Sequence, residues 1–258
     1  MNFIDTHTHL FASEFNDDID IVVKNAINSG VSKMLLPNID STTTNNMLQL
    51  CNKYPQHCFP MIGLHPCSVK KDNIEKEILH VEEMLNKNNF IAIGEIGLDL
   101  YWDKSTLSFQ KVAFESQIKL AKKYQLPIVV HVRDSFNEAI EIVEKLNNES
   151  LSGVFHCFTG NIQEAERIIN LENFYLGIGG VVTFKNGGIN KIINQVSLDN
   201  IILETDSPYL TPTPFRGKRN ESKYLVNIAQ KMSEIYEIDI NEIANKTSSN
   251  AINLFKIS

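Results

Sequence analysis

Two histidines with one residue between them, His7 and His9, follow the short predicted strand 3–6. In an extended strand alternate side chains point to the same side, so both imidazoles can face one metal ion. An exposed turn can carry the same pair by chance, so the pair alone is weak evidence for a metal site.

Side chains that commonly bind metals also stand at the ends of other predicted strands: Glu95, His131, His156, Glu204 and Asp206. Glu95 follows an apolar run, where burying a carboxylate costs free energy unless it is paired or bound to a metal. A salt bridge across the mouth of a barrel would satisfy this carboxylate equally well. Each residue taken singly therefore leaves a structural role open.

The histidines as a group carry the stronger indication. Five of the seven lie at or just beyond the carboxyl end of a predicted strand: His7, His9, His65, His131 and His156. No functional role is predicted for His57 or His80. Because barrel enzymes place their chemistry where the carboxyl ends of the strands meet, this clustering predicts an active site there.

The predicted elements that would position these side chains alternate along the chain. Short β-branched runs cover 3–6, 33–37, 58–64, 90–95, 128–131, 154–156, 174–178 and 201–205. Helical patterns cover 105–124, 135–146, 162–171, a segment from about 222, and 241–255, while 211–220 reads as a loop. The alternation predicts an α/β fold, a TIM (β/α)8 barrel that forms a single domain over residues 1–258. A doubly wound open sheet has the same periodicity and stays the alternative.

Composition limits the function classes. The 258 residues carry a net charge of −7, which argues against a protein that coats duplex DNA nonspecifically but allows an enzyme that binds phosphate through metal ions. The four cysteines form no CxxC pair, and no apolar run approaches the ~20 residues that span a bilayer. The first residues lack the pattern of a signal peptide. We therefore expect a cytoplasmic protein with no membrane contact.

Seven motifs in order resemble the TatD family of metal-dependent deoxyribonucleases, within the amidohydrolase-like metallo-barrels. They are Asp5-Thr6-His7-Thr8-His9, Gly63-Leu64-His65-Pro66, Gly94-Glu95-Ile96-Gly97-Leu98-Asp99, His131-Val132-Arg133, His156-Cys157-Phe158-Thr159-Gly160, Glu204-Thr205-Asp206-Ser207-Pro208 and 216–221. The resemblance covers nearly the whole chain. It implies hydrolysis of DNA phosphodiester bonds, as a 3′–5′ exonuclease on single strands or ends, by a two-metal hydroxide mechanism.

The resemblance also implies a ligand set for two divalent cations per chain. His7, His9 and Asp206 would bind one ion, His131 and His156 the other, and Glu95 both. A bridging carboxylate is consistent with general chemistry, since it offsets the repulsion between two nearby cations. Four imidazoles favour Zn or Mn over Mg, whereas the family is linked to Mg, so the metal stays open among the three.

Further residues receive roles within this hypothesis. Asp206 is predicted to take a proton from the attacking water, and Glu95 is the other catalytic candidate. Glu204 and Asp99 have either a supporting role beside the ligands or a purely structural one. Tyr101 is a candidate to stack on an unpaired base together with Trp102, unless the two rings only cap the barrel.

Phosphate contacts outside the metal ligands are expected from Arg133 and His65. Arg133 follows a predicted ligand by two residues and offers a bidentate guanidinium. The segment 216–219, which begins with Arg216, carries three positive charges and is predicted to attract a polyanion. We expect a monomer, because no partner helix is evident.

Two other readings remain. Related barrels that open cyclic amides or lactones often bridge their metals with a carboxylated lysine after the fourth strand, where this chain has Glu95. The same ligands would also serve a D-aminoacyl-tRNA ester hydrolase. A third interpretation is not an enzyme: a metal-binding interaction protein would hold metal but have no catalytic activity. The complete set of predicted ligands argues against this interpretation.

Overall fold

The computed structural model describes residues 2–148 and 150–257. In this part of the chain eight parallel strands form a barrel: β1 (Phe3–Asp5), β2 (Val31–Pro37), β3 (Cys58–Met61), β4 (Ile93–Asp99), β5 (Ile128–Arg133), β6 (Gly153–Phe155), β7 (Phe174–Ile178) and β8 (Ile201–Leu203). Neighbouring strands pair in sequence order within β1–β3 and β4–β8. Bridges between Ile62 and Ile93 and between Thr8 and Ser207 join the two sheets, so the predicted barrel is confirmed.

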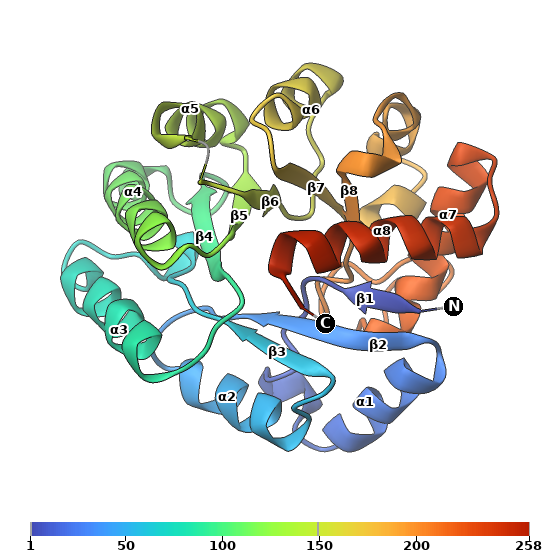
Figure 1. Cartoon of the computed structure of the whole chain (residues 1–258), viewed down its shortest axis with the longest axis horizontal. Helices are drawn as coiled ribbons and strands as arrows, with labels where there is room; N and C mark the ends of the chain where they lie inside the picture. The colour runs from blue at the N-terminus through green and yellow to red at the C-terminus, as the bar shows by residue number, and fades with distance from the viewer. Residues whose placement is uncertain (1, 149, 258) are drawn as a thin grey trace.

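Helices form a ring outside the strands (Figure 1). They are α1 (Ile19–Asn28), α2 (Thr44–Lys53), α3 (Ile74–Lys87), α4 (Leu107–Tyr124), α5 (Phe136–Leu146), α6 (Ile162–Ile169), α7 (Leu225–Tyr236) and α8 (Ile240–Phe255). Between β7 and β8 the fully described segment 179–200 holds short 3-10 turns instead of an α-helix. None of the described helices combines the length and apolar character needed to cross a bilayer.

The barrel interior is filled by one apolar layer. It contains one residue from every strand region except β7: Ile4, Leu35, Met61, Ala92, Val129, Val154 and Ile202. From β7 the partly buried Tyr175 packs against it. Leu254, Phe255 and Ile257, from the end of α8 and just beyond it, pack against this layer. The same segment of α8 lies near residues that precede β5, β6 and β7, so it covers the amino end of the barrel and leaves the carboxyl end for the site.

The predicted bounds of the fourth strand are wrong. The strand was expected over 90–95, with Glu95 at its end, but β4 runs from Ile93 to Asp99 and Glu95 lies inside it. The pairing register with β5 shifts between Ile93 and Ile96, so β4 contains a bulge at this point. The amide of Glu95 donates to the carbonyl oxygen of Asn38 at 3.1 Å, away from the β5 ladder.

Candidate metal centre

Glu95 lies at the middle of the site, and its two carboxylate oxygens face different histidines. Oε2 is 3.1 Å from His7 Nε2 and 3.4 Å from His9 Nε2. Oε1 is 2.8 Å from both His131 Nδ1 and His156 Nε2. The carboxylate is therefore placed between two pairs of imidazoles, and only 2% of the residue is exposed.

Asp206 completes the group on the Oε2 side. Its Oδ1 atom lies 3.7 Å from His7 Nε2 and 3.5 Å from His9 Nε2. The residue follows β8 with a φ of 56°, in the left-handed region, and its amide donates to the His7 carbonyl at 2.9 Å. The positive φ of Asp206 turns its backbone toward the end of β1. All six predicted ligands thus lie together at the carboxyl end of the barrel.

Small residues allow the strands to approach here. Gly97 has a φ of 141°, and a Cβ atom at this position would lie 2.1 Å from the carbonyl oxygen of His131. At Gly177 a Cβ atom would lie 2.4 Å from Glu204 Oε2. Any larger residue would push β5 or the buried Glu204 carboxylate out of place.

The contacts between imidazoles fit bound cations. His7 Nε2 lies 3.2 Å from His9 Nε2, and His131 Nδ1 lies 3.3 Å from His156 Nε2. Two ring nitrogens that face each other cannot both donate a proton, but two lone pairs can share one cation. A mixed set of imidazoles and carboxylates suits Zn²⁺ or a similar transition ion. The residues present therefore fit a metal centre.

Two more carboxylates support the histidines from behind. Asp99 Oδ2 accepts a hydrogen bond from His131 Nε2 at 3.0 Å. Glu204 Oε1 lies 3.4 Å from His156 Nδ1 and accepts the Cys157 amide proton at 2.6 Å. Asp99 and Glu204 are therefore placed to orient His131 and His156, which is the supporting role considered for them from the sequence.

The charges in the site favour ionised carboxylates. Burial would raise the pKa of Glu95, but the surrounding imidazoles, that of His156 foremost, hold that pKa well below its ordinary value. Burial likewise opposes ionisation of Asp99, yet the hydrogen bond from His131 lowers its pKa to about 2. Both acids can therefore act as anions at neutral pH.

A cavity of about 620 Å³ opens above the centre. His65 lies on its wall, with Nε2 at 3.3 Å from Glu95 Oε1. Arg133 and the 71%-exposed Trp102 also line it. Tyr209, which the sequence analysis did not single out, lines the cavity as well. Its position three residues after Asp206 was the sequence feature that could have indicated it.

Tyr101 contacts an arginine, and its stacking on an unpaired base stays a prediction. The Arg133 guanidinium carbon lies 3.6 Å above the centre of the Tyr101 ring, so this ring holds an arginine. The amides of Tyr101 and Trp102 both point to Asp99 Oδ1, at 3.0 and 3.4 Å. The pair is thus anchored to the same carboxylate that supports His131.

The basic segment 216–219 only partly has the predicted arrangement. Arg216 is exposed; it donates to the Thr211 carbonyl at 3.0 Å and stacks on Phe184. Arg219 forms a bidentate ion pair with Asp18 at 2.8 and 2.7 Å. Because Asp18 neutralises the charge of Arg219, this arginine connects the start of α1 to the loop after β8.

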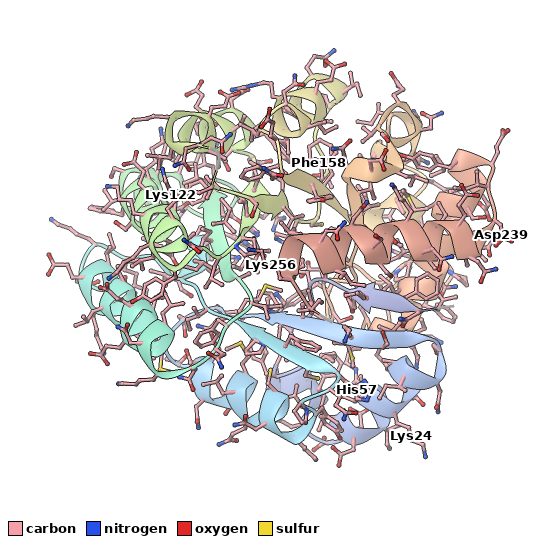
Figure 2. The ribbon with its side chains drawn as sticks, in the orientation of Figure 1. Lys24, His57, Lys122, Phe158, Asp239 and Lys256 are labelled. Carbon is pink, nitrogen blue, oxygen red and sulfur yellow. The ribbon has the colours of Figure 1, made fainter. Side chains whose placement is uncertain are left out.

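The two histidines without a predicted role lie outside the centre. His57 sits beside β2 and β3 (Figure 2), where its Nδ1 donates to the Ser32 carbonyl at 2.7 Å. His80 Nε2 lies 2.9 Å from Thr44 Oγ1 on α2. Both contacts are structural.

The chain matches the family model described as TatD related DNase over residues 4–256. The chain belongs to the TatD-related DNase family. Membership confirms the resemblance seen in the motifs and the hydrolase class expected from them. The metal-dependent character of its relatives agrees with the donor set gathered around Glu95.

Relatives with this TatD fold match over their full length. The uncharacterized metal-dependent hydrolase YabD of Bacillus subtilis is 37% identical, covering 98% of this chain and 99% of the relative. A 3′-5′ ssDNA/RNA exonuclease TatD of Edwardsiella piscicida is 29% identical, covering 99% and 100%. The crystal structure of YJJV, a TatD homologue from Escherichia coli, aligns with a TM-score of 0.90 at 28% identity, covering 99% and 98%.

Proposed function

We propose that this protein hydrolyses phosphodiester bonds of DNA, as a 3′–5′ exonuclease on single strands, with two divalent cations. The carboxylate of Glu95 carries the proposal, because its two oxygens face separate groups of ligand atoms at 2.8 to 3.4 Å. A carboxylate shared in this way suits two neighbouring cations. All the ligands come from one chain, so a monomer is the proposed active unit.

His7, His9 and Asp206 would hold the first cation, His131 and His156 the second, and Glu95 both. Zn, Mn and Mg are the candidates. When bound, the pair would activate a water molecule and neutralise the oxygens of a phosphodiester. The protein's own part is to present these donors already assembled and largely shielded from solvent.

Four further side-chain roles toward the substrate are proposed: proton acceptance, phosphate binding, base stacking and electrostatic attraction. Burial raises the pKa of Asp206, but the hydrogen bond with His9 and the charges of the neighbouring imidazoles together lower it below its ordinary value. The carboxylate is therefore ionised and would accept the proton of the attacking water. Arg133 would bind a phosphate through the N–H groups at the edge of its stacked guanidinium. Trp102, largely exposed at the cavity, would stack on an unpaired base. Arg216 would add attraction for the polyanion from further out.

The substrate class is supported by chemistry and by similarity. A relative that the chain matches over its full length is named a 3′-5′ ssDNA/RNA exonuclease. The cavity of about 620 Å³ combines a metal-ligand floor with an arginine and an indole at the rim. An anionic ester with an unpaired base fits this combination.

A substrate panel tests the proposal. Metal-free protein reloaded with Mg, Mn or Zn would be given single-stranded DNA labelled at either end, duplex DNA, bis-p-nitrophenyl phosphate and a D-aminoacyl-tRNA. We expect stepwise shortening of the single strand from its 3′ end. Cleavage of the aminoacyl ester alone would contradict the proposal and indicate a D-aminoacyl-tRNA ester hydrolase instead.

Asp206→Asn is the matched control for this panel, because it keeps the size of the side chain and removes its charge. We expect this variant to lose turnover by about 10²–10⁴-fold, as removal of a general base does. Metal uptake with no turnover by the wild-type protein on any substrate would instead favour an interaction protein.

A further inference from the structure

His65 has the opposite hydrogen-bonding arrangement from its neighbour His131. It precedes the short 3-10 turn Pro66–Ser68, and its Nδ1 accepts the backbone amide proton of Cys67 at 3.0 Å. A backbone amide can only donate, so Nδ1 must carry the lone pair. In a neutral imidazole the single ring proton is then on Nε2.

That Nε2 atom points into the centre. It lies 3.3 Å from Glu95 Oε1, and His65 lines the cavity. The N–H bond on this side of the ring therefore lies beside the Glu95 carboxylate, at the floor of the cavity. A nitrogen that bears a proton has no lone pair to give to a cation.

His131 shows what a ligand looks like in the same site. Its Nε2 donates to the Asp99 carboxylate, so the proton is on the outer nitrogen and the lone pair of Nδ1 faces Glu95. This pairing of an outer carboxylate with an inner lone pair is typical of metal-binding histidines. His131 has an acceptor behind it, whereas His65 has a donor.

Distance alone would place His65 among the ligands. His65, Glu95 and His131 offer atoms within 4.8 Å of one another, a spacing that suits a shared ion. We infer instead that His65 is a neutral hydrogen-bond donor, fixed by the Cys67 amide so that Nε2–H serves an anionic oxygen of the bound substrate. This inference rests on the proposed phosphodiester function for the identity of that oxygen.

The backbone around His65 is held in a way that suits a fixed donor. Its amide donates to the Ile39 carbonyl at 2.8 Å. The preceding Leu64 is clamped by the side chain of Gln117, which accepts its N–H at 2.7 Å and donates to its C=O at 3.1 Å. Pro66 has no amide proton, so the Cys67 amide is the nearest following donor for the ring. The ring is oriented by three neighbouring segments.

A matched pair of variants tests the donor role. In His65→Gln the amide nitrogen can reach the position of Nε2, whereas in His65→Asn the amide reaches only about as far as Nδ1. We expect turnover to fall by about 10²–10³-fold in His65→Asn, as when one donor to a developing anion is removed. His65→Gln should recover at least a tenfold part of that loss. Equal losses in the two variants would overturn the donor role.

Metal content separates donor from ligand without reference to activity. After zinc loading and gel filtration, both His65 variants should hold as many ions per chain as the wild-type protein. His131→Ala, which removes a ligand, should hold fewer. Loss of an ion in the His65 variants would make His65 a ligand and overturn the inference.

Two further measurements keep the inference independent of the DNA hypothesis. Nitrogen NMR of ¹⁵N-histidine protein, with the His65 signal assigned by its loss in His65→Gln, should show the proton on Nε2 both without and with zinc. Inorganic phosphate, titrated calorimetrically into zinc-loaded protein, should bind at least tenfold more weakly to His65→Asn. A proton on Nδ1, or unchanged phosphate binding, would refute the assignment even if DNA is the substrate. Absence of DNA cleavage by the wild type, with these results intact, would refute only the proposed function.

Discussion

The candidate metal ligands and the rim of the cavity are held in place by different forces. Around Glu95 the side chains are buried or mostly buried and contact one another at 2.8 to 3.7 Å. At the rim, Tyr101, Trp102 and Tyr209 are 53%, 71% and 51% exposed, and Arg133 is held by ring stacking. The centre is therefore organised before substrate arrives, whereas the rim can adjust to it.

Asp99 connects the two regions. One of its oxygens accepts from His131 in the centre, and the other from the amides of Tyr101 and Trp102 at the rim. The buried centre and the exposed rim should therefore respond differently to substitutions. Changes in the centre should alter metal content and turnover, changes at the rim should alter substrate affinity, and Asp99 should affect both.

The largest effect is expected from Glu95→Ala. Loss of the shared carboxylate removes a ligand from both cations and leaves facing imidazoles without a counter-charge. We expect fewer than one tightly held ion per chain and a fall in turnover of at least about 10³-fold, since metal ions supply several kcal/mol of charge stabilisation. Elemental analysis after gel filtration measures the first quantity and a phosphodiester assay the second.

Glu95→Gln is the companion variant, because it preserves volume and removes charge. It should lie between Ala and the wild type in metal content. A Glu95→Ala protein that still holds two ions would show that the carboxylate does not bridge, and the contrast between a preassembled centre and an adaptable rim would lose its basis.

Asp99→Asn is expected to come next. Neutralising this acid weakens the partner of His131, and such supporting groups are typically worth 10–100-fold in metal affinity. One of the two zinc-binding steps should therefore weaken by about this factor while the other stays within a few-fold. Competition titration with a chromophoric chelator resolves the two steps. Equal weakening of both would mean that Asp99 acts on the whole centre through its fold.

The centre was predictable from sequence because its signal is chemical and local. Histidines and acids after apolar runs predicted a cluster at one end of the barrel, and the family resemblance implied which of them would bind metal. Parallel strands bring their carboxyl ends together in any barrel. The place of Glu95 inside β4 was not predictable, since it depends on a bulge set by pairing with β5. Nor was the tautomer of His65, which depends on one backbone amide.

The rim was harder to predict because a charge has no fixed role until its partner is known. Arg216 and Arg219 look alike in the sequence, yet Arg219 is paired with Asp18, 201 residues away in the chain. Tyr101 and Trp102 are adjacent and the Arg133 guanidinium lies over both rings, at 3.6 and 5.5 Å, but of the two it is Trp102 that lines the cavity. Such distinctions come from contacts between distant segments, which periodicity does not encode.

A smaller effect is expected from Arg133→Ala. The guanidinium lies at the rim, so its removal should raise the Michaelis constant for single-stranded DNA by about tenfold, the value of one charge-assisted hydrogen bond of about 1.5 kcal/mol. Turnover and metal content should stay within a few-fold of the wild type. Arg133→Lys is the control: it keeps the charge but not the planar fork, and should recover part of the affinity. A fall in turnover with an unchanged Michaelis constant would place Arg133 with the centre instead.

The smallest effect is expected from Arg219→Ala, which separates structural from substrate-facing arginines. Because Arg219 is paired with Asp18, we expect an unchanged Michaelis constant and a loss of stability below about 1 kcal/mol, typical of a partly exposed ion pair.

The hydrogen bond from Arg219 lowers the pKa of Asp18 beneath its ordinary value of 3.8. A lowered carboxyl pKa stabilises the fold above that ordinary value and ceases to do so as the pH falls through the folded-state pKa. The stability difference between variant and wild type, followed by urea unfolding, should therefore be present at pH 7 and vanish in acid. A rise in the Michaelis constant instead would mean that the Asp18 pair opens to meet the substrate, and that the rim extends to the loop after β8.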